Sequence, residues 1–474
     1  MVTSQSRNCR SIVACCLVCL WVLTLMTTRT LYFHLYFCET CGPRTCNRTD
    51  LACLASHAAV ATPASTARAV TLCILDEHYV DNFLNFAESA ERASVHNLLP
   101  TTITEAAYAA LQNLGIASYF RPFMNESSET RESKFKTKAF NLKGGMKSQT
   151  ALSLLRLGYS VLVLDLDTFI IRDPFPYMNC TDCDFEVATT RDTSFGRNMC
   201  IGVIFFRPTV NMMEMLSTQI RRLYHDPTQW DQFLFTTIAY EYRRKGKIKY
   251  NFLSFTLFPN GHDFKFLNRD IFKFDAYKEV AIVHNNMAME ITRKQYRAKE
   301  TGTWILDKNG YYSDPSAKYL TYDNPLAGYE KKEVASLFTA VAIAKSLGRI
   351  LILPQFHCTK KKEKVQVKCS LEHVMNINAF HKKTGFTGYR ENYFLRHFKV
   401  PKEVLASTTA PILFLTRETE AMELPLHSVV AFRHPDGRAP TLEDINVWLK
   451  PYRNKSIIRL HSLYFSLNGK KSPN

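Results

Sequence analysis

The feature that most constrains the fold is a helix, a glycine and a strand followed directly by two acids. Residues 147–157 have the spacing of an amphipathic helix, and Gly158 is a suitable C-terminal cap. Residues 159–164, Tyr-Ser-Val-Leu-Val-Leu, form a β-prone apolar run that ends at Asp165-Leu-Asp167. A buried strand that follows a helix in this way predicts α/β layering around a mostly parallel sheet.

The two acids at the end of this strand predict a ligand site. In an open α/β sheet, ligands bind beyond the carboxyl ends of the strands. Asp165 and Asp167 stand two residues apart where the chain turns, so both carboxylates can approach one site. Hard carboxylate oxygens suit Mg²⁺ or Mn²⁺, and such an ion can bridge a diphosphate. The alternative is a strand-end turn with two solvated acids.

The chain of 474 residues is long enough for two or three folded units. We expect a first α/β domain at residues 69–313 and a smaller α/β domain at residues 314–474. Their predicted elements are apolar runs of strand type and helical patterns, several of which end at glycine. They lie at residues 70–75, 105–114, 147–157 and 159–164 in the first domain, and at residues 330–347, 350–354, 411–415, 428–432 and 441–449 in the second.

Composition excludes several classes of protein. With 46% hydrophobic and 22% charged residues, the chain is globular, not disordered, collagen-like or a coiled coil. The 60 Lys and Arg residues exceed the 43 Asp and Glu residues, which gives a net charge of +17. This excess points to an acidic partner but does not identify it. No nucleic-acid-binding motif is present, so nucleic acid is not an expected partner.

The N-terminal segment predicts a membrane anchor. Residues 12–28 carry no charge and are flanked by basic residues. An uncleaved signal anchor is favoured over a cleaved signal peptide, because no clear small-residue cleavage site follows, and over a buried helix. We expect a cytosolic tail at residues 1–11, a stem at residues 29–68 and luminal domains. Four glycosylation sequons beyond the anchor agree with this type II arrangement; they lie at Asn47, Asn125, Asn179 and Asn454.

Cysteine spacing adds to the luminal interpretation. In the stem, Cys38, Cys41, Cys46 and Cys53 favour disulfides over a zinc site, because no histidines follow at zinc-finger spacing. Cys180-x-x-Cys183 can be a redox motif or a structural disulfide, and the luminal location favours the structural disulfide.

The segment that contains the two acids resembles the nucleotide-diphospho-sugar transferases, in the group of plant extensin arabinosyltransferases and rhamnogalacturonan xylosyltransferases. These are membrane-anchored Golgi enzymes of the GT-A type, classed in glycosyltransferase family 77. Motifs similar to theirs follow in the same order over residues 70–313. They are Lys147 with Gly158, Asp165-Leu-Asp167, Arg172-Asp-Pro-Phe-Pro176, Gly202–Pro208, Trp230-Asp-Gln232, Phe258–Gly261, Val283–Asn286 and Trp304.

The resemblance implies a role for each matching residue. Asp165 and Asp167 are expected to hold Mn²⁺ or Mg²⁺ with His284 as third ligand, and through the metal the donor diphosphate. Lys147 is expected to pair with a phosphate; a solvated surface lysine is the alternative. Asp231 and Gln232 are expected to line the sugar pocket and to act in catalysis. Donor binding is expected to involve Lys147, Asp165, Asp167, Asn198, Cys200 and Gly202.

The second predicted domain resembles the C-terminal extension of the extensin arabinosyltransferases. The similar segments are Tyr319–Asp323, the alanine-rich stretch at residues 340–344, Gly348–Pro354, Cys358 and Cys369–His373. The resemblance implies a disulfide between Cys358 and Cys369, across a lysine-rich loop. That loop can hold an acidic acceptor, but a solvated charge run is favoured.

One residue departs from the family pattern. Where relatives commonly carry Asn-x-Gly, this chain has Cys200-Ile-Gly202, and a thiol replaces the hydrogen bonds of an amide poorly. Asn198 is a possible substitute. The prediction is a metal-dependent, retaining glycosyltransferase of the Golgi membrane. It would transfer a sugar from a UDP-sugar to a glycan or glycoprotein, with arabinose favoured and galactose or xylose open. The alternatives are a non-catalytic glycan-binding protein or scaffold with this fold and, less favoured, a haloacid-dehalogenase-type phosphatase.

Overall fold

The computed structural model describes residues 46–467 of the chain, with gaps. The residues outside its description are 1–45, 61–67, 124–136, 181–182, 194–195, 266–277, 325–329, 361–363, 385–387, 417–428, 464, 466 and 468–474. No helix among the described residues is long and apolar enough to cross a membrane. The predicted anchor at residues 12–28 lies outside the described residues.

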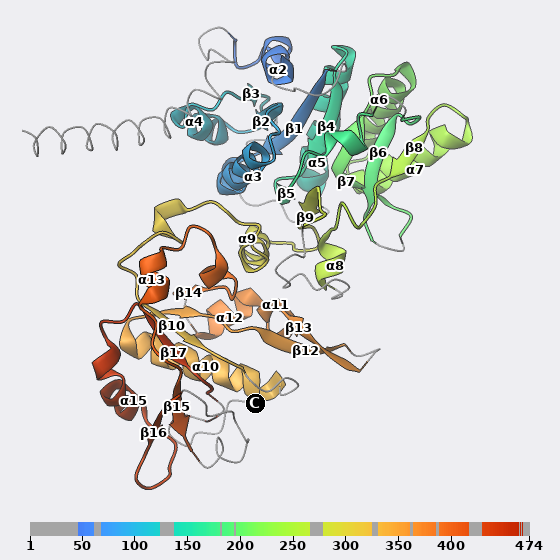
Figure 1. Cartoon of the computed structure of the whole chain (residues 1–474). Coiled ribbons are helices and arrows are strands. Elements are labelled where there is room, and N and C mark those ends of the chain that lie inside the picture. The colour runs from blue at the N-terminus through green and yellow to red at the C-terminus, as the bar shows by residue number, and fades with distance from the viewer. Residues whose placement is uncertain are drawn as a thin grey trace, which may run out of the picture. The chain divides into compact units, whose positions relative to one another are not determined.

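The described chain divides into two compact units, each of which is α/β (Figure 1). The first unit comprises residues up to Phe258 together with Ala281–His284, and the second comprises Pro259–Val280 and the chain from Asn285 onward. Residues 285–313 therefore group with the second unit. The predicted α/β class is confirmed in the described residues, with one large sheet in each unit.

The first unit is built on a seven-stranded sheet in the order β3-β2-β1-β4-β7-β6-β8. All neighbours pair in parallel except β7, which is antiparallel to both β4 and β6. The elements in chain order are α2 (Leu51–Val60), β1 (Ala69–Leu75), α3 (Val80–Arg92), β2 (Leu98–Thr102), α4 (Glu105–Asn113), β3 (Tyr119–Phe120), α5 (Lys138–Arg156), β4 (Ser160–Leu164), β5 (Thr168–Ile170), β6 (Val187–Arg191), β7 (Met199–Phe206), α6 (Val210–His225), α7 (Asp231–Arg244), β8 (Tyr250–Phe252) and β9 (Ile282–His284).

Alternation along the central strand β4 separates two cores. Val161 and Val163 belong to the core cluster that includes side chains of α5, α6 and α7, while Leu162 and Leu164 join the cluster that includes α3. Successive side chains of a strand point to opposite faces, so an uninterrupted apolar run is what a strand covered on both faces requires. Each fully buried Val or Leu contributes roughly 1.5–3 kcal/mol relative to an exposed one.

Helix α5, which leads into β4, is longer than predicted. It begins at Lys138 rather than near Lys147, with Thr137 as the N-cap residue. Two consecutive glycines, Gly144 and Gly145, lower the helical propensity of this stretch, but they allow close packing. A Cβ atom on Gly145 would lie 2.7 Å from Cδ2 of Leu223 on α6. Tertiary packing therefore stabilises a helix where local propensity is poor.

The second unit contains a six-stranded parallel sheet in the order β14-β11-β10-β17-β15-β16. The predicted helices at 330–347 and 441–449 are present, and the second carries a capping box at Thr441. The elements are α8 (Gly261–Lys265), α9 (Ile291–Glu300), β10 (Tyr319–Tyr322), α10 (Glu330–Leu347), β11 (Ile350–Ile352), β12 (Phe356–Lys360), β13 (Val365–Cys369), α11 (Leu371–Val374), α12 (Ile377–Thr384), β14 (Tyr389–Arg390), α13 (Lys402–Ala406), β15 (Ile412–Leu415), β16 (Val430–Arg433), α15 (Leu442–Trp448) and β17 (Ile457–Leu460).

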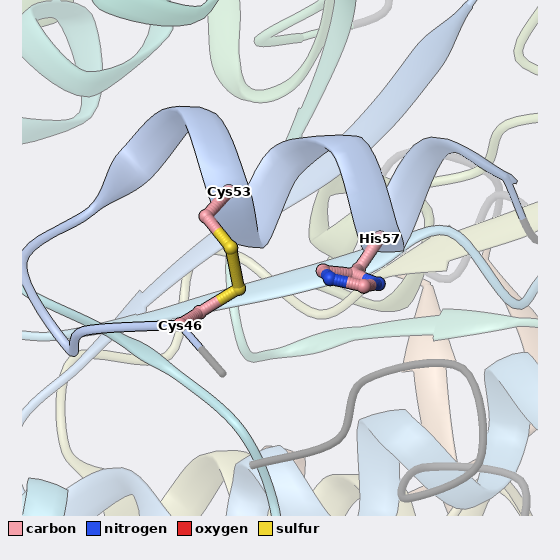
Figure 2. Close-up of side chains that lie close together, drawn as sticks. All are labelled: Cys46, Cys53 and His57. Carbon is pink, nitrogen blue, oxygen red and sulfur yellow. A yellow bond between two sulfur atoms is a disulfide. The ribbon is translucent and has the colours of Figure 1, made fainter. Parts of the chain in front are cut away.

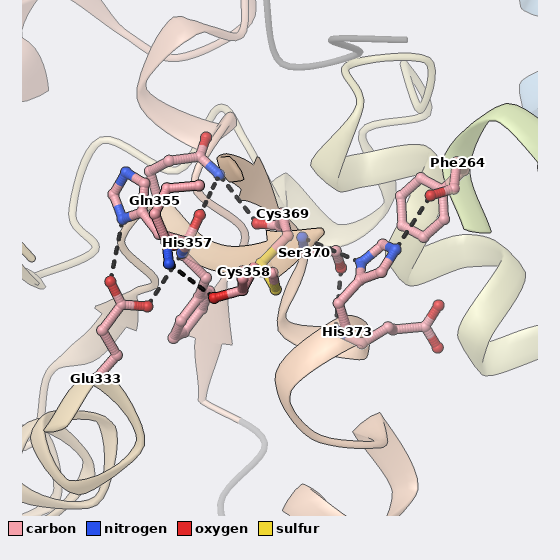
Figure 3. Close-up of a disulfide and its surroundings, with 12 residues drawn as sticks. Phe264, Glu333, Gln355, His357, Cys358, Cys369, Ser370 and His373 are labelled. Carbon is pink, nitrogen blue, oxygen red and sulfur yellow. Dashed lines mark hydrogen bonds and ion pairs between the residues drawn. A yellow bond between two sulfur atoms is a disulfide. The ribbon is translucent and has the colours of Figure 1, made fainter. Parts of the chain in front are cut away.

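Three disulfides lie in the described residues. The disulfide between Cys358 and Cys369 joins strands β12 and β13 of a hairpin in the second unit (Figure 3). His357 on β12 also contacts α10, because its Nδ1 lies 3.0 Å from Oε1 of Glu333. Cys180 pairs with Cys183. Both of these bonds were expected from the sequence.

In the segment predicted to be a stem, Cys46 is bonded to Cys53 at the start of α2, and His57 lies one helical turn further along (Figure 2). These three residues are close enough to suggest a metal site. The disulfide uses both thiols, so the structure favours the disulfide interpretation of this pair. Cys38 and Cys41 lie outside the described residues.

Candidate active site

Asp165 and Asp167 lie at the turn between β4 and β5, at the carboxyl end of the central strand. The backbone of this turn is fixed, because the amide of Asp165 donates to the carbonyl of Gly202 on β7 at 2.9 Å. The amide and hydroxyl of Thr168 both donate to the carbonyl of Asp165, at 3.0 Å and 2.7 Å. Asp167 is buried and Asp165 is half-buried. These hydrogen bonds fix the backbone of the turn from which both acids project.

His284 reaches the same place from a distant part of the sequence. It ends β9, which pairs antiparallel with β5 so that His284 stands opposite Thr168 (Figure 1). Its Nε2 lies 3.4 Å from Oδ1 of Asp167, and both side chains are almost fully buried. The ligand atoms of Asp165, Asp167 and His284 all lie within 4.8 Å of one another. The structure thus brings the three predicted metal ligands together.

These donor groups fit a divalent cation. Two carboxylates and an imidazole are suitable ligands for Mn²⁺, and the carboxylates alone suit Mg²⁺. Positive groups already face the carboxylates: Nζ of Lys147 lies 2.7 Å from Oδ1 of Asp165. Burial lowers the pKa of His284. The electrostatic and hydrogen-bond interactions with Cys200 and Asp167 raise it by more, so the pKa of His284 stands well above its ordinary value. The site is therefore built to hold positive charge.

Gly202 is the residue that leaves room for this cluster. A Cβ atom at this position would lie 2.7 Å from Oδ2 of Asp165 and would overlap the ring of His284. The φ angle of Gly202 is not in the left-handed region, so backbone conformation does not require a glycine here. The reason for glycine is the lack of space for a side chain. The adjacent Cys200 is buried, and its Sγ lies 3.4 Å from Nδ1 of His284.

Lys147 interacts electrostatically with both Asp165, a candidate metal ligand, and Asp231. Burial lowers the pKa of Lys147, but Asp165 and Asp231 more than offset this, so the pKa is raised. Asp231 is buried at the start of α7, and burial raises its pKa to about 6 although Lys147 opposes the rise. A Cβ on Gly144 would overlap the carboxylate of Asp231, so α5 and α7 approach closely at this point.

Gln232 and Asn198 are placed differently. Oε1 of Gln232 accepts from the amide of Ile201 at 3.4 Å, while its buried Nε2 makes no hydrogen bond within the described chain. A donor of this kind is available to a ligand. Asn198 lies just before β7, and its carbonyl accepts from the amide of Asp192 at 3.0 Å. No described contact joins the side chain of Asn198 to the cluster, so its role in donor binding stays a prediction.

A second lysine–aspartate pair lies beside the first, and the sequence analysis missed it. Lys143 lies 3.3 Å from Asp76, which directly follows β1, the parallel neighbour of β4. Lys143 and Lys147 are four residues apart on α5, so they lie on one face of the helix. The sequence contained a signal for this second pair. Acids follow two adjacent parallel strands, and the two lysines are spaced four residues apart on one helix.

Comparison with known proteins relates residues 93–297, which contain the site, to a known family. Residues 93–297 match the model of the nucleotide-diphospho-sugar transferases. The chain is 26% identical over 259 residues to beta-arabinofuranosyltransferase RAY1 of Arabidopsis thaliana; the match covers 51% of this chain and 48% of the relative. It is 24% identical over 322 residues to arabinosyltransferase XEG113 of the same plant, covering 54% of this chain and 48% of the relative. The chain thus spans about half the length of these curated relatives.

Solved structures of glycosyltransferases are also similar, but distantly. Galactosyltransferase LgtC in complex with donor and acceptor sugar analogues has a TM-score of 0.30 and 16% identity, covering 46% of this chain and 87% of that chain. A similarity at this level is too weak to relate the folds in detail, so the family assignment rests on the sequence match. That match contains every residue of the cluster, from Lys147 to His284. Residues 93–297 therefore match the nucleotide-diphospho-sugar transferase family.

Proposed function

We propose that this protein is a metal-dependent, retaining glycosyltransferase that uses a UDP-sugar. The observation that carries the proposal is the convergence of Asp165, Asp167 and His284 at the carboxyl end of β4, inside the family match. The family match favours a transferase over the haloacid-dehalogenase-type phosphatase. The first unit supplies both the metal ligands and the buried polar groups around them.

The site residues divide the work of the reaction. Asp165, Asp167 and His284 would hold Mn²⁺ or Mg²⁺. When bound, the ion would neutralise charge on the departing diphosphate. Lys147 would pair with a phosphate oxygen, and to do so it would exchange its contact with Asp165 for one with the donor. The ion pair with Asp165 keeps the ammonium charged and near the site until then.

Asp231 and Gln232 would face the donor sugar. As the bond from the anomeric carbon to the diphosphate breaks, positive charge develops on the ring, and a nearby carboxylate or amide oxygen stabilises it. The acceptor hydroxyl forms the new glycosidic bond on the face that the diphosphate leaves, and its proton passes to a phosphate oxygen. Nε2 of Gln232 has no hydrogen-bond partner within the described chain, and a sugar hydroxyl would give it one.

Arabinose is the favoured donor sugar. The names of the relatives RAY1 and XEG113 both specify arabinosyl transfer, and RAY1 is described as a beta-arabinofuranosyltransferase. Galactose and xylose stay open, because fold and family do not fix the substrate. The acceptor would be a glycan or glycoprotein.

A Golgi location with luminal domains is part of the same proposal. The apolar segment at residues 12–28 would anchor the chain as a single-pass type II membrane protein. The disulfides Cys46–Cys53, Cys180–Cys183 and Cys358–Cys369 support an oxidising compartment.

The deciding experiment is a donor panel with the purified full-length chain and Mn²⁺. UDP release would be measured with UDP-arabinofuranose, UDP-arabinopyranose, UDP-xylose and UDP-galactose, with and without a chelator. We expect one pentose donor to be turned over. Both the chelator and the Asp167→Ala substitution should abolish that turnover. Turnover that survives Asp167→Ala would overturn the metal assignment. No turnover of any donor by a folded protein would favour the non-catalytic glycan-binding alternative.

A further inference from the structure

The thiol of Cys200 contacts the proposed metal ligand His284 from the side away from the carboxylates. Its Sγ lies 3.4 Å from Nδ1, while the other ring nitrogen, Nε2, faces Asp167. Cys200 and Cys73 are the two free cysteines among the described residues, and both are buried. Only Cys200 is in contact with the cluster.

The backbone around Cys200 is arranged to aim this side chain. Strand β7 pairs with β6, and the register shifts between Thr189 and Thr190, so that Cys200 stands opposite Thr190. Such an irregularity re-aims the side chains beside it and is common near functional sites. The hydroxyl of Thr189 contacts the carbonyls of Cys200 and Val203, at 2.6 Å and 3.1 Å, and thereby closes the distorted segment. The thiol is therefore held at the ring by main-chain structure.

The chemistry of a metal-binding histidine gives this contact a purpose. For Nε2 to bind a metal it must present its lone pair, so the ring proton must sit on Nδ1. An acceptor at Nδ1 fixes that tautomer and the orientation of the ring, and ligating histidines nearly always have one. Carboxylates and carbonyls are the usual acceptors. Sulfur is a weaker one, but here it is within hydrogen-bond distance in a buried site.

We propose that Cys200 is a positioning residue that orients His284 for metal binding. Nδ1–H of His284 donates to Sγ of Cys200, and Nε2 is thereby directed toward the ion held by Asp165 and Asp167. The residue that replaces the family asparagine then serves the metal rather than the donor sugar. This inference rests on the metal site of the proposed function.

The direct test is Mn²⁺ binding without any donor, measured by calorimetry and by the Mn²⁺ electron paramagnetic resonance signal. Loss of a hydrogen bond to a metal ligand typically weakens metal binding by about 10- to 100-fold. We expect Cys200→Ala to bind Mn²⁺ more weakly within that range. Cys200→Ser, which keeps an acceptor at the same place, should recover most of the loss. Cys73→Ala, the matched variant at the other free buried thiol, should bind like the wild type.

A second measurement separates positioning from direct ligation. With Co²⁺ in place of Mn²⁺, a thiolate ligand produces a charge-transfer absorption, which an orienting thiol does not. We expect no such band in the wild-type protein. Its presence, with loss in Cys200→Ala, would overturn the positioning role in favour of a sulfur ligand.

The outcomes distinguish this inference from the proposed function. If the wild type binds no Mn²⁺, the metal site itself fails. If the wild type binds Mn²⁺ and Cys200→Ala binds as tightly, only the positioning role fails. Circular dichroism and the thermal midpoint would establish that each variant folds. Should Cys200→Ala be misfolded, Cys200→Val keeps the volume without an acceptor, and it must show the same loss of Mn²⁺ affinity that serine restores.

Discussion

The ammonium group of Lys147 lies 2.7 Å from Oδ1 of Asp165, so the residue proposed to meet the donor diphosphate contacts a proposed metal ligand. The pair is partly shielded from solvent, with side-chain exposures of 17% and 35%. One carboxylate therefore has two possible positive partners, the lysine and a metal ion. If the proposed function holds, this contact would couple donor binding to metal binding.

Replacing Lys147 by methionine should move the affinities for metal and donor in opposite directions. Without the competing ammonium, Asp165 is free for the ion, and Mn²⁺ should bind a few-fold more tightly. The donor should lose one charge-assisted hydrogen bond, which is worth about 1.5–3 kcal/mol, or roughly 10- to 150-fold in affinity. Calorimetry with Mn²⁺ and with UDP would measure both effects.

Arg156→Met at the exposed end of α5 is the control for this prediction, since it removes a positive charge from the same helix. It should change neither affinity. If Lys147→Met weakened both ligands equally, the lysine would have no separate role toward the diphosphate.

Two glycine substitutions should separate the metal site from the sugar site. In Gly202→Ala the new Cβ would lie 2.7 Å from Oδ2 of Asp165, and metal binding should be lost. In Gly144→Ala the Cβ would overlap the carboxylate of Asp231 instead. That variant should retain Mn²⁺ binding and lose most sugar transfer. Overpacking of this kind costs about 1–3 kcal/mol of stability in either variant, so each serves as the other's control. Equal Mn²⁺ affinity in the two variants would contradict the assignment.

The sequence was sufficient where local pattern and local chemistry agree. The apolar run at residues 159–164 predicts strand β4. The two acids that follow this run, Asp165 and Asp167, predict the turn at its end. Helix α10 was predicted at residues 330–347 with its end at Gly348, and the structure has it at Glu330–Leu347 with a positive φ at that glycine. In these cases one segment contains the whole signal.

The sequence was insufficient where a contact joins distant segments through backbone detail. Cys200 and His284 are separated by 84 positions, and their contact depends on a register shift in β6 and β7. No residue pattern indicates that shift, so the cysteine was interpreted only as a departure from the family asparagine. The meeting of His284 with the two acids was predicted, but through the family resemblance and not from the local sequence.

Replacing Gln232 by leucine should reduce activity without much effect on stability. The buried Nε2 has no hydrogen bond within the described chain, and the bond from the Ile201 amide to Oε1 is long at 3.4 Å. Removing an unsatisfied polar group from the interior is close to neutral, so unfolding should change by no more than about 1 kcal/mol. Transfer should fall by roughly 10-fold or more, because a donor to the sugar is lost.

Gln219→Leu is the matched control, because Gln219 on α6 is likewise buried and its amide oxygen has no hydrogen-bond partner among the described residues. It should leave both stability and transfer unchanged. Urea unfolding and UDP release would be measured on both variants. A large loss of stability in Gln232→Leu would show a structural role instead.

The stability of the second unit should fall as the pH rises from about 4.5 to about 8, because of Glu300. This side chain ends α9, is 3% exposed, and accepts from the hydroxyl of Tyr296 at 3.2 Å. Burial raises its pKa from 4.5 to about 8, and Glu372 adds to the rise. Between those values the unfolded chain releases a proton that the folded chain keeps, so the free energy of unfolding falls by up to about 1.4 kcal/mol per pH unit.

Glu300→Gln, which mimics the protonated acid, should flatten this pH dependence and be more stable than the wild type near pH 8. Exposed Glu403→Gln on α13 should follow the wild-type profile in urea unfolding across the same range. A slope unchanged in Glu300→Gln would mean that another group titrates.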